Sequence, residues 1–496
     1  MKKALSLVLI IAIFISCFST VVSAYEAPMM EITTTKTLHD AENGYHKENA
    51  QNVLIQYVDD VDVFVNALKS AIANCDETFD LEPYNMPTYV YYEISDYLFY
   101  GMPEAFNVYQ VGCSYYPTTG KLSCLAFTYS SFADTASEYA VCFDKINESA
   151  NKLLDGIKGN SALNDEQKLL LLHDRLATWN SYGYPANTTQ IEGHTAYGAL
   201  VNRKSVCQGY AMAYMYLLNQ VGIESYYCSS ATLNHGWNIV ILNGERYHVD
   251  VTWDDPTPDR IGGVRHENFL RSSVGIISTD HEALDFDFSP TDTKYDNYFW
   301  QNSYAEFQVV DNDVYYIDNN AGLLKRYDNL VLYDVNALWP AGFLTYWDGN
   351  FACLESDGKS LFYSQPKSIY RFDLQSGTSE VIYTPNTSTY QSIFGFSYID
   401  KTITCTISDS PNYIIQQMTI PYEYTYKPDV IYGDANGDGR INGKDYGVLL
   451  QYLNGWDVKI SSEGADVNND GRVNGRDYGI LLQYLNGWDV ILGPRT

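Results

Sequence analysis

The chain has 496 residues, a formal net charge of −30 and a hydrophobic fraction of 46%. This length exceeds what one hydrophobic core ordinarily organises, so the sequence predicts three or more domains. The strong negative charge repels phosphate backbones and anionic lipid surfaces, which excludes nucleic acid and such membranes as partners.

The first 24 residues have the layout of a secretory signal peptide. Lys2 and Lys3 precede an apolar run that begins at Ala4, and small residues end at Ala24. Cleavage there removes the two lysines and takes the formal charge from −30 to −32. Since no later stretch is apolar for long enough to span a bilayer, we expect a secreted, extracellular protein whose mature form has no membrane segment.

Residues 25–160 predict an N-terminal α+β lobe. Helical periodicity appears at 60–74 and 137–157, while 105–116 and 121–130 have the pattern of a hairpin. Most cysteines of the mature chain are expected to be buried, because their spacing matches no zinc site or disulfide scaffold. A disulfide between Cys113 and Cys124 remains an alternative that an extracellular setting permits.

The chemistry is predicted at residues 161–290. The segment RKSVCQGYAMAYMYLLNQ at 203–220 is a short polar approach followed by a long run of helix formers. Cys207 therefore begins a helix, where unpaired amides and the helix dipole favour a thiolate. We predict Cys207 to be a nucleophile, with a buried structural cysteine as the alternative.

A hairpin is predicted downstream of this helix. HGWNIVIL at 235–242 and ERYHVDV at 245–251 flank Asn243-Gly244, a strong signal for a two-residue turn. Such a turn pairs Leu242 with Glu245 and, by counting back, Trp237 with Asp250.

This register places His235 and Asp250 on one face of the hairpin, as diagonal neighbours roughly 7–8 Å apart at the backbone. A nucleophile, a base, and a carboxylate that fixes the tautomer of the base form the common arrangement for covalent acyl transfer. His235 is therefore the predicted base and Asp250 its partner. His248 shares the same face and is the alternative base.

Other conspicuous residues near these positions receive structural interpretations. Trp237 is expected to shield the site or pack on the sheet, and His173-Asp174 to serve packing and capping on a helix that Asn164 starts. The segment 253–256 should end the strand and turn the chain. His194 is interpreted as a loop residue.

The motifs VCQGYA around Cys207, HGWN around His235 and YHVDVTWDD around Asp250 resemble the transglutaminase-like (papain-like) superfamily, in its secreted bacterial branch. The similarity spans approximately residues 50–285. It implies a papain-like transglutaminase core with Cys207 as nucleophile, His235 as general base and Asp250 as orienting acid, acting on a protein or peptide substrate.

The resemblance also implies an oxyanion hole made by the Cys207 backbone N–H and a second donor. Tyr182, Tyr184 and Gln208 all remain open as that donor. No cofactor is implied for the catalytic step.

Residues 295–425 predict a β-rich accessory domain, because short Tyr-rich segments alternate with Asn, Asp and Gly turns. About three repeated units are too few to close a propeller, which favours a β-sandwich. Trp300, Trp339 and Trp347 are expected either to be buried or to stack on sugar rings. The stretch 421–434 is interpreted as a linker.

The last 64 residues contain two copies of a calcium-loop motif, beginning at Asp434 and at Asp466. Oxygen-bearing side chains at positions one, three, five, nine and twelve, a glycine at six and a main-chain carbonyl at seven are typical of a Ca²⁺ site. The predicted ligands are Asp434, Asn436, Asp438, the Arg440 carbonyl, Asn442 and Asp445 in the first loop, and Asp466, Asn468, Asp470, the Arg472 carbonyl, Asn474 and Asp477 in the second.

Near-identical segments follow the loops, DYGVLLQYLNGWDV at 445–458 and DYGILLQYLNGWDV at 477–490. Residues 431–492 thereby resemble the type I dockerin family, a small all-α module with two structural Ca²⁺ ions. The resemblance implies docking onto a cohesin module of a scaffoldin, so that the protein would be a component of a cellulosome. The repeated helices imply that either copy could face the cohesin.

The fold class expected is therefore multidomain α+β, with a papain-like core, a β-rich accessory domain and a dockerin. The function expected is a secreted, cellulosome-associated cysteine enzyme that acts on amide bonds through a thioester, with hydrolysis by a peptidase or amidase favoured over cross-linking. The alternative is a carbohydrate-active or carbohydrate-binding component of polysaccharide degradation whose transglutaminase-like domain is not catalytic.

Overall fold

The computed structural model describes residues 31–37, 53–186, 190–257, 259–281, 290–337, 350–387, 391–399, 401–410, 413–421 and 430–493. The predicted signal peptide, Trp339, Trp347 and most of the predicted linker lie outside the described residues. The chain divides into two compact units, Met1–Pro421 and Tyr422–Thr496. Among the helices that the structure describes, none has the length and apolar character needed to cross a bilayer.

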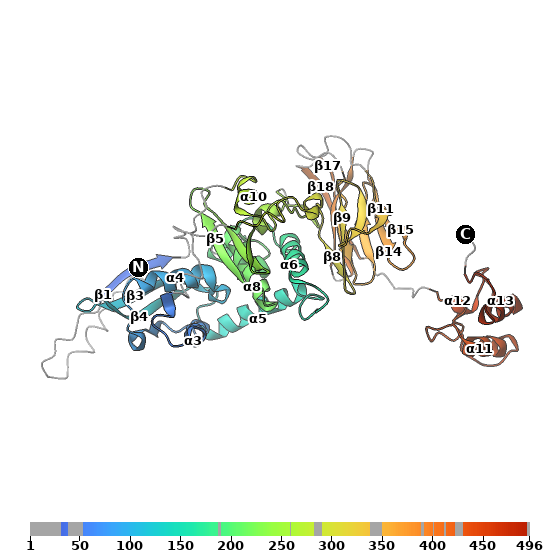
Figure 1. Cartoon of the computed structure of the whole chain (residues 1–496), viewed down its shortest axis with the longest axis horizontal. Coiled ribbons are helices and arrows are strands. Elements are labelled where there is room, and N and C mark those ends of the chain that lie inside the picture. Colours follow the sequence, from blue (N-terminus) through green and yellow to red (C-terminus); the bar gives the residue numbers. More distant parts are fainter. Residues whose placement is uncertain are drawn as a thin grey trace. The chain divides into compact units, whose positions relative to one another are not determined.

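The first unit combines helices with several small antiparallel sheets (Figure 1). Its N-terminal part has a four-stranded sheet in the order β1-β3-β4-β2. The elements of this part are β1 (Glu31–Thr37), α3 (Val61–Ala73), β2 (Thr78–Asp80), η1 (Glu82–Tyr84), α4 (Val90–Asp96), η2 (Tyr97–Gly101), η3 (Pro103–Ala105), β3 (Val108–Tyr116), β4 (Lys121–Tyr129) and α5 (Ala136–Leu153).

The hairpin β3–β4 also tests the alternative of a disulfide between Cys113 and Cys124. Cys113 lies opposite Leu125, and Ser114 lies opposite Cys124. Because neighbouring residues of a strand point to opposite faces, the sulfurs of Cys113 and Cys124 face away from each other. The two cysteines are not joined.

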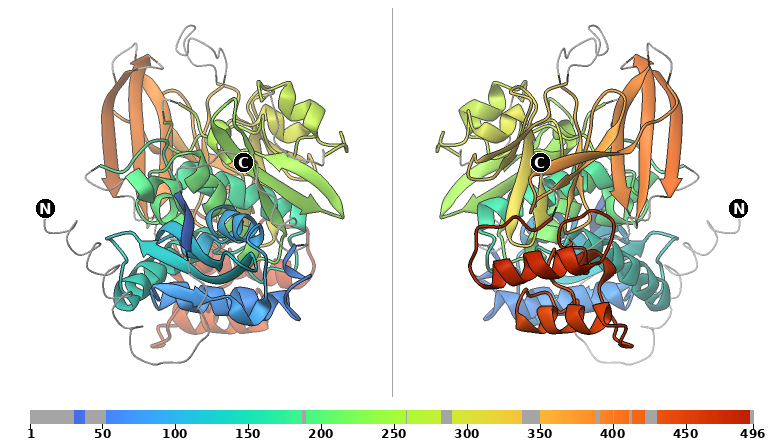
Figure 2. Two further views of the ribbon diagram at one scale, coloured as in Figure 1. Left: turned by 90° about the vertical axis from the view of Figure 1, so that its left-hand side faces the viewer. Right: turned by 90° about the vertical axis from the view of Figure 1, so that its right-hand side faces the viewer.

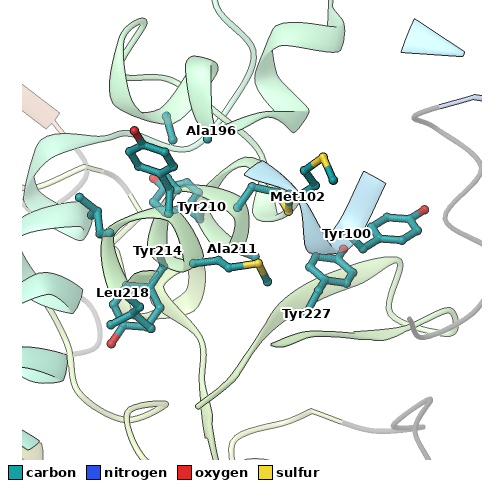
Figure 3. Close-up of a cluster of buried hydrophobic side chains, with 14 of the residues drawn as sticks. Tyr100, Met102, Ala196, Tyr210, Ala211, Tyr214, Leu218 and Tyr227 are labelled. Atoms are coloured by element: carbon teal, nitrogen blue, oxygen red, sulfur yellow. The ribbon is translucent and has the colours of Figure 1, made fainter. Parts of the chain in front are cut away.

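The central part of this unit is built around a buried helix, α8. Its elements are α6 (Asp165–Trp179), η4 (Gln190–His194), α7 (Ala196–Leu200), α8 (Cys207–Gln220), β5 (Ser225–Ser230), β6 (His235–Leu242), β7 (Glu245–Val249), α9 (Val251–Asp254), α10 (Ser273–Ile277) and η5 (Phe299–Asn302). Every residue from Gln208 to Leu218 is buried, because β5, β6, α6 and α7 all contact this helix. Figure 3 shows Tyr210, Ala211, Tyr214 and Leu218 along it, within one apolar cluster.

In its described residues, the β-rich part forms three successive antiparallel sheets, in the orders β11-β10-β9-β8, β12-β13-β14-β15 and β16-β17-β18. The expected two-sheet sandwich is thus not what the described strands form. Figure 2 shows the long strands of the third sheet side by side. The strands are β8 (Gln308–Val310), β9 (Asp313–Asp318), β10 (Leu323–Arg326), β11 (Val331–Asp334), β12 (Leu354–Ser356), β13 (Leu361–Ser364), β14 (Ile369–Asp373), β15 (Thr378–Tyr383), β16 (Ser392–Ile399), β17 (Thr402–Ser410) and β18 (Tyr413–Pro421).

The second unit is helical, with α11 (Gly443–Leu453), α12 (Ser462–Ala465) and α13 (Gly475–Leu485). Helices α11 and α13 each follow one predicted calcium loop and are started by Asn442 and Asn474, each within a capping box. The buried apolar core of this unit is small, and its members are Ala435, Leu449, Ala465, Val467 and Leu481.

Candidate active site

Cys207 is the first residue of α8, as its sequence context predicts. The preceding Val206 is extended, with φ −92° and ψ 179°, and provides no side-chain cap. The first-turn amides of the helix are therefore not capped by that side chain, and they create a positive environment beside the sulfur. Gly209 allows this helix end to lie close to the 190–194 segment, since a Cβ there would lie 2.5 Å from the Gly193 carbonyl oxygen.

His235 begins β6 and points to Cys207. The hairpin has the predicted register, from Leu242 opposite Glu245 to Asn238 opposite Val249. The His235 Nε2 donates to Oδ2 of Asp250 at 2.6 Å, which leaves Nδ1 for the side of the ring that shares a cavity with Cys207. Burial lowers the pKa of His235, but the charge and hydrogen bond of Asp250, together with Cys207, outweigh it and raise the pKa to about 10.

Asp250 differs from its predicted position inside a strand. β7 ends at Val249, and Asp250 is instead the N-cap of the short helix α9. Its Oδ1 accepts the backbone N–H groups of Thr252 at 2.9 Å and Trp253 at 3.3 Å. Burial alone would raise the pKa of Asp250, but the neighbouring imidazoles hold it below its ordinary value, so the group is a carboxylate.

A second imidazole binds the same carboxylate. His281 donates from Nε2 to Oδ2 of Asp250 at 2.9 Å and is fully buried. Its ring lies 4.1 Å from that of Trp253 and 4.9 Å from that of Trp237, measured between centroids. The sequence interpretation did not include His281, because it follows Asp250 by about thirty residues and has no local motif around it.

The alternative base, His248, does not reach the Cys207 cavity. It is completely buried, where Nδ1 accepts a hydrogen bond from Trp237 Nε1 at 3.0 Å and Nε2 lies 3.1 Å from Ser273 Oγ. Burial, and then the charge of His281, lower the pKa of His248 to about 3. A neutral, enclosed imidazole of this kind supports the sheet and cannot take a proton from Cys207.

Cys207 and His235 open into a cavity of about 230 Å³. The three oxyanion candidates Tyr182, Tyr184 and Gln208 all line it, as does His194. Among the described residues that line it, none is Asp, Glu, Lys or Arg, although the chain carries a net charge of −30.

His194 is a residue of this cavity and not the loop residue that the sequence indicated. It ends η4, and its Nδ1 lies 3.2 Å from Gln208 Oε1. Its Nε2 lies 3.4 Å from the hydroxyl of Tyr184. Gln208 in turn donates from Nε2 to the Phe99 carbonyl at 3.2 Å, so hydrogen bonds to Phe99 and His194 fix the orientation of its amide group.

A second buried network lies at the other end of α9. As predicted, Asn164 caps α6, and Gln167 completes the capping box. His173 and Asp174, assigned to packing and capping, are instead part of a hydrogen-bonded cluster: His173 donates to Asp174 at 2.8 Å and to Asp254 at 3.1 Å. Despite burial, these two carboxylates raise the pKa of His173 to about 9.

The same cluster connects the central part to the β-rich part through a hydrogen bond from the Phe307 backbone to Asp174. Asp174 also accepts from His266 Nε2 at 3.0 Å and from the Phe307 backbone N–H at 2.8 Å. Trp300 is completely buried in the adjoining apolar core, so it packs the interior and does not stack on sugars.

In the second unit, backbone amides surround the acidic side chains of the repeated loops. Asp434 accepts backbone N–H groups from Gly437 and Asp438 through Oδ1, and Asp445 accepts those of Asn436 and Asn442. The sixth-position glycines adopt φ of +80° and +81°, which favours glycine.

The charge in these loops fits a divalent cation. Burial raises the pKa of Asp445, and although backbone N–H groups oppose this, the negative charge of Asp434 adds to it. Asp466 and Asp477 are equally buried in the second loop. Two buried carboxylates in each loop, together with amide and carbonyl oxygens, form the oxygen-rich set that Ca²⁺ binds.

Comparison with known proteins bears chiefly on this second unit. Residues 432–486 match the Dockerin type I domain model. No curated protein matches the chain. A solved structure titled "Crystal structure of a TGase" is 15% identical, with a TM-score of 0.20, and the match covers 27% of this chain and 41% of that chain. A TM-score this low does not establish a shared fold.

Proposed function

The C-terminal module belongs to the dockerin type I family, and from this premise we propose that the protein is a cellulosome component whose larger unit is a transglutaminase-like cysteine enzyme. A dockerin implies binding to a cohesin module, and cellulosome components are typically extracellular. That setting agrees with the signal peptide expected at 1–24. The proposed modules are the N-terminal lobe at 25–160, the papain-like core at 161–290, the β-rich domain at 295–425 and the dockerin at 431–492.

The dockerin role includes two Ca²⁺ ions, held by the side chains and carbonyls of the two loops. Bound calcium would neutralise the buried carboxylates and fix the loops that start α11 and α13. Large apolar side chains are exposed at equivalent positions of both repeats, including Trp456 at 62% and Trp488 at 64%. This equivalence supports cohesin binding by either repeat.

The enzymatic step begins with proton transfer from the Cys207 thiol to Nδ1 of His235. The sulfur then attacks the carbonyl carbon of an amide, forming the C–S bond while an electron pair moves to the carbonyl oxygen. When the carbonyl reforms, the C–N bond breaks and the leaving amine takes its proton from the His235 imidazolium. A thioester on Cys207 and a free amine result.

Asp250 supports both halves of this exchange. Its hydrogen bond to Nε2 keeps the ring oriented and stabilises the imidazolium, as the raised pKa of His235 indicates. A water molecule that gives its proton to His235 would then hydrolyse the thioester. We favour hydrolysis of a protein or peptide amide over transfer to a lysine amine, and in both cases the acyl group would occupy the cavity beside Cys207.

The observation that carries this proposal is the 2.6 Å bond between His235 and Asp250 beside a cysteine at the start of a buried helix. The test incubates the full chain with casein and a fluorescent primary amine, with Cys207→Ala as the matched control. New peptide termini without incorporated amine support hydrolysis, and incorporation supports transfer. If neither exceeds the Cys207→Ala background, the enzymatic proposal is contradicted.

A second candidate function, action on carbohydrate, is favoured by another cavity in the same unit. This cavity, of about 990 Å³, is lined by Glu306 and Glu355. Burial raises the pKa of Glu306 to about 7. Burial, followed by the negative charge of Glu306, also raises the pKa of Glu355 well above its ordinary value. A pair of carboxyl groups, one of them protonated, is what glycoside hydrolysis uses.

This candidate is tested by reducing-sugar release from plant polysaccharide. Release that survives Cys207→Ala but is lost in Glu355→Gln would favour it over the cysteine mechanism. Equal release by the wild type and Glu355→Gln would exclude this carboxyl group from any such reaction.

A further inference from the structure

Tyr227 reaches the candidate active site from the strand next to the one that carries His235. It lies on β5 opposite Asn238 of β6, and only 4% of its surface is exposed. Its ring is stacked on that of Tyr100, with centroids 5.0 Å apart and planes inclined by 20°. Figure 3 shows the two rings side by side. The orientation of the phenol is thus fixed by packing before any substrate binds.

The hydroxyl of Tyr227 extends along the sheet to the residue after His235. A Cβ at Gly236 would lie 1.9 Å from this oxygen, so glycine is what makes room for the phenol. Tyr227, Gly236, His235 and Cys207 line the same cavity. Within the described residues, the Tyr227 hydroxyl makes no hydrogen bond, so its proton is available to a group that enters the cavity.

Burial keeps this group a donor. It raises the pKa of Tyr227 well above 10, and a negative charge on Cys207 raises it further. The phenol therefore keeps its proton during the reaction of Cys207, and it is suited to meet negative charge that develops nearby.

We propose that the Tyr227 hydroxyl is the side-chain donor of the oxyanion hole, paired with the backbone N–H of Cys207. The proposal rests on the proposed cysteine mechanism and adds a residue to it. When the sulfur attacks, the carbonyl electron pair moves to oxygen, and that oxygen accepts hydrogen bonds from the N–H of Cys207 and the O–H of Tyr227. Neither donor loses its proton, and both bonds weaken as the carbonyl reforms.

The earlier candidates are less suited to this task. Gln208 donates its amide N–H to Phe99, and Tyr184 is engaged with His194. Tyr182 is about half exposed, so water competes for its hydroxyl, whereas Tyr227 is enclosed. An enclosed donor acts in a lower dielectric, where each hydrogen bond to an anion is stronger.

The test compares two reactions of Cys207 in the full chain. Acylation by 4-nitrophenyl acetate passes through an oxyanion, whereas alkylation by iodoacetamide displaces iodide at a saturated carbon and forms none. Tyr227→Phe should slow acylation by about 10²-fold, the loss typical of one oxyanion donor, and leave alkylation unchanged. Tyr226→Phe is the matched control, because its hydroxyl bonds Glu224 on the opposite face of β5, and it should change neither rate.

Three outcomes would overturn the assignment of Tyr227. The first is acylation of Tyr227→Phe at the wild-type rate. The second is an equal slowing of acylation and alkylation in that variant. The third is slowed acylation with unchanged alkylation in Tyr182→Phe, but not in Tyr227→Phe. A wild-type chain whose Cys207 reacts with neither reagent contradicts the cysteine mechanism itself, which is a separate result.

Discussion

Asp250 holds the candidate site together, because its carboxylate accepts hydrogen bonds from two imidazoles and two backbone amides. One oxygen accepts from both His235 and His281, and the other accepts from the amides at the start of α9. The carboxylate cannot rotate without breaking several of these bonds. The ring of His235 is thereby held toward Cys207.

Changing His281 should therefore reduce activity without touching the reacting atoms. His281→Leu removes the second donor on Asp250, and we expect kcat/KM to fall about 10-fold because His235 is less well oriented. His281→Gln keeps an N–H group and should restore much of the loss. Equal activity in the Leu variant and the wild type would show that His281 does not position Asp250.

The raised pKa of His235 predicts the alkaline limit of the reaction. The imidazolium is the form that protonates the leaving amine, and it persists up to a pH of about 10, the raised pKa. Activity should thus fall as the pH rises through about 10. In Asp250→Asn the negative charge that raises the pKa of His235 is gone, so the alkaline limit should move to lower pH. The activity of this variant should also be lower at every pH. An unshifted limit in kcat/KM profiles would contradict this origin.

For single residues, the sequence predicted the positions that depend on their neighbours along the chain. Cys207 starts a helix because helix formers follow it, and the Asn243-Gly244 turn determines the hairpin register. His281 and Tyr227 were missed because their positions depend on packing across the fold. A tyrosine in a strand and a histidine in a polar segment have no distinctive local pattern.

Among the elements, α9 joins the candidate site to the rest of the unit. Asp250 caps its beginning, and Asp254 at its end accepts from His173 and from Asn268. The sequence predicted a strand here because the apolar alternation continues through Val251, and it missed that Asp250 serves as an N-cap. The buried cluster at Asp254 was equally hidden, because its members come from distant segments.

The buried cluster around Asp174 should contribute strongly to stability. Asp174→Asn leaves donors from His173, His266 and Phe307 without their carboxylate, and we expect unfolding free energy to fall by about 3 kcal/mol. Asp165→Asn is the same change on the same helix at a 57% exposed side chain, and it should cost about 0.5 kcal/mol or less. Chemical denaturation of both variants measures the difference, and equal losses would contradict the role of the cluster.

For the whole molecule, the division into two compact units predicts independent responses to calcium removal. The second unit has a small apolar core, so its order should depend on the ions. A chelator should abolish cohesin binding and reduce the helical signal of residues 430–493, while the alkylation rate of Cys207 stays unchanged. Loss of both properties together would show that the units are coupled.

The overall plan was also partly predictable. Two repeated loops identified the dockerin, and alternating Tyr-rich segments indicated a β-rich region. The arrangement of that region in three separate sheets did not follow, because strand patterns do not state which strands share a sheet.

The central claim is tested most directly by labelling the native protein with a limiting amount of iodoacetamide and mapping the modified peptide. Cys207 should be modified first, because among the other cysteines that the structure describes five are buried and only Cys75 and Cys124 are also partly exposed. Burial, followed by the charge of Asp134, raises the pKa of Cys75 to about 11, and Cys124 lies within strand β4 and not at a helix N-terminus that would activate it. In His235→Ala this preference for Cys207 should disappear. Modification spread evenly over several cysteines in the wild type, or undiminished preference for Cys207 in His235→Ala, would contradict an activated Cys207–His235 pair.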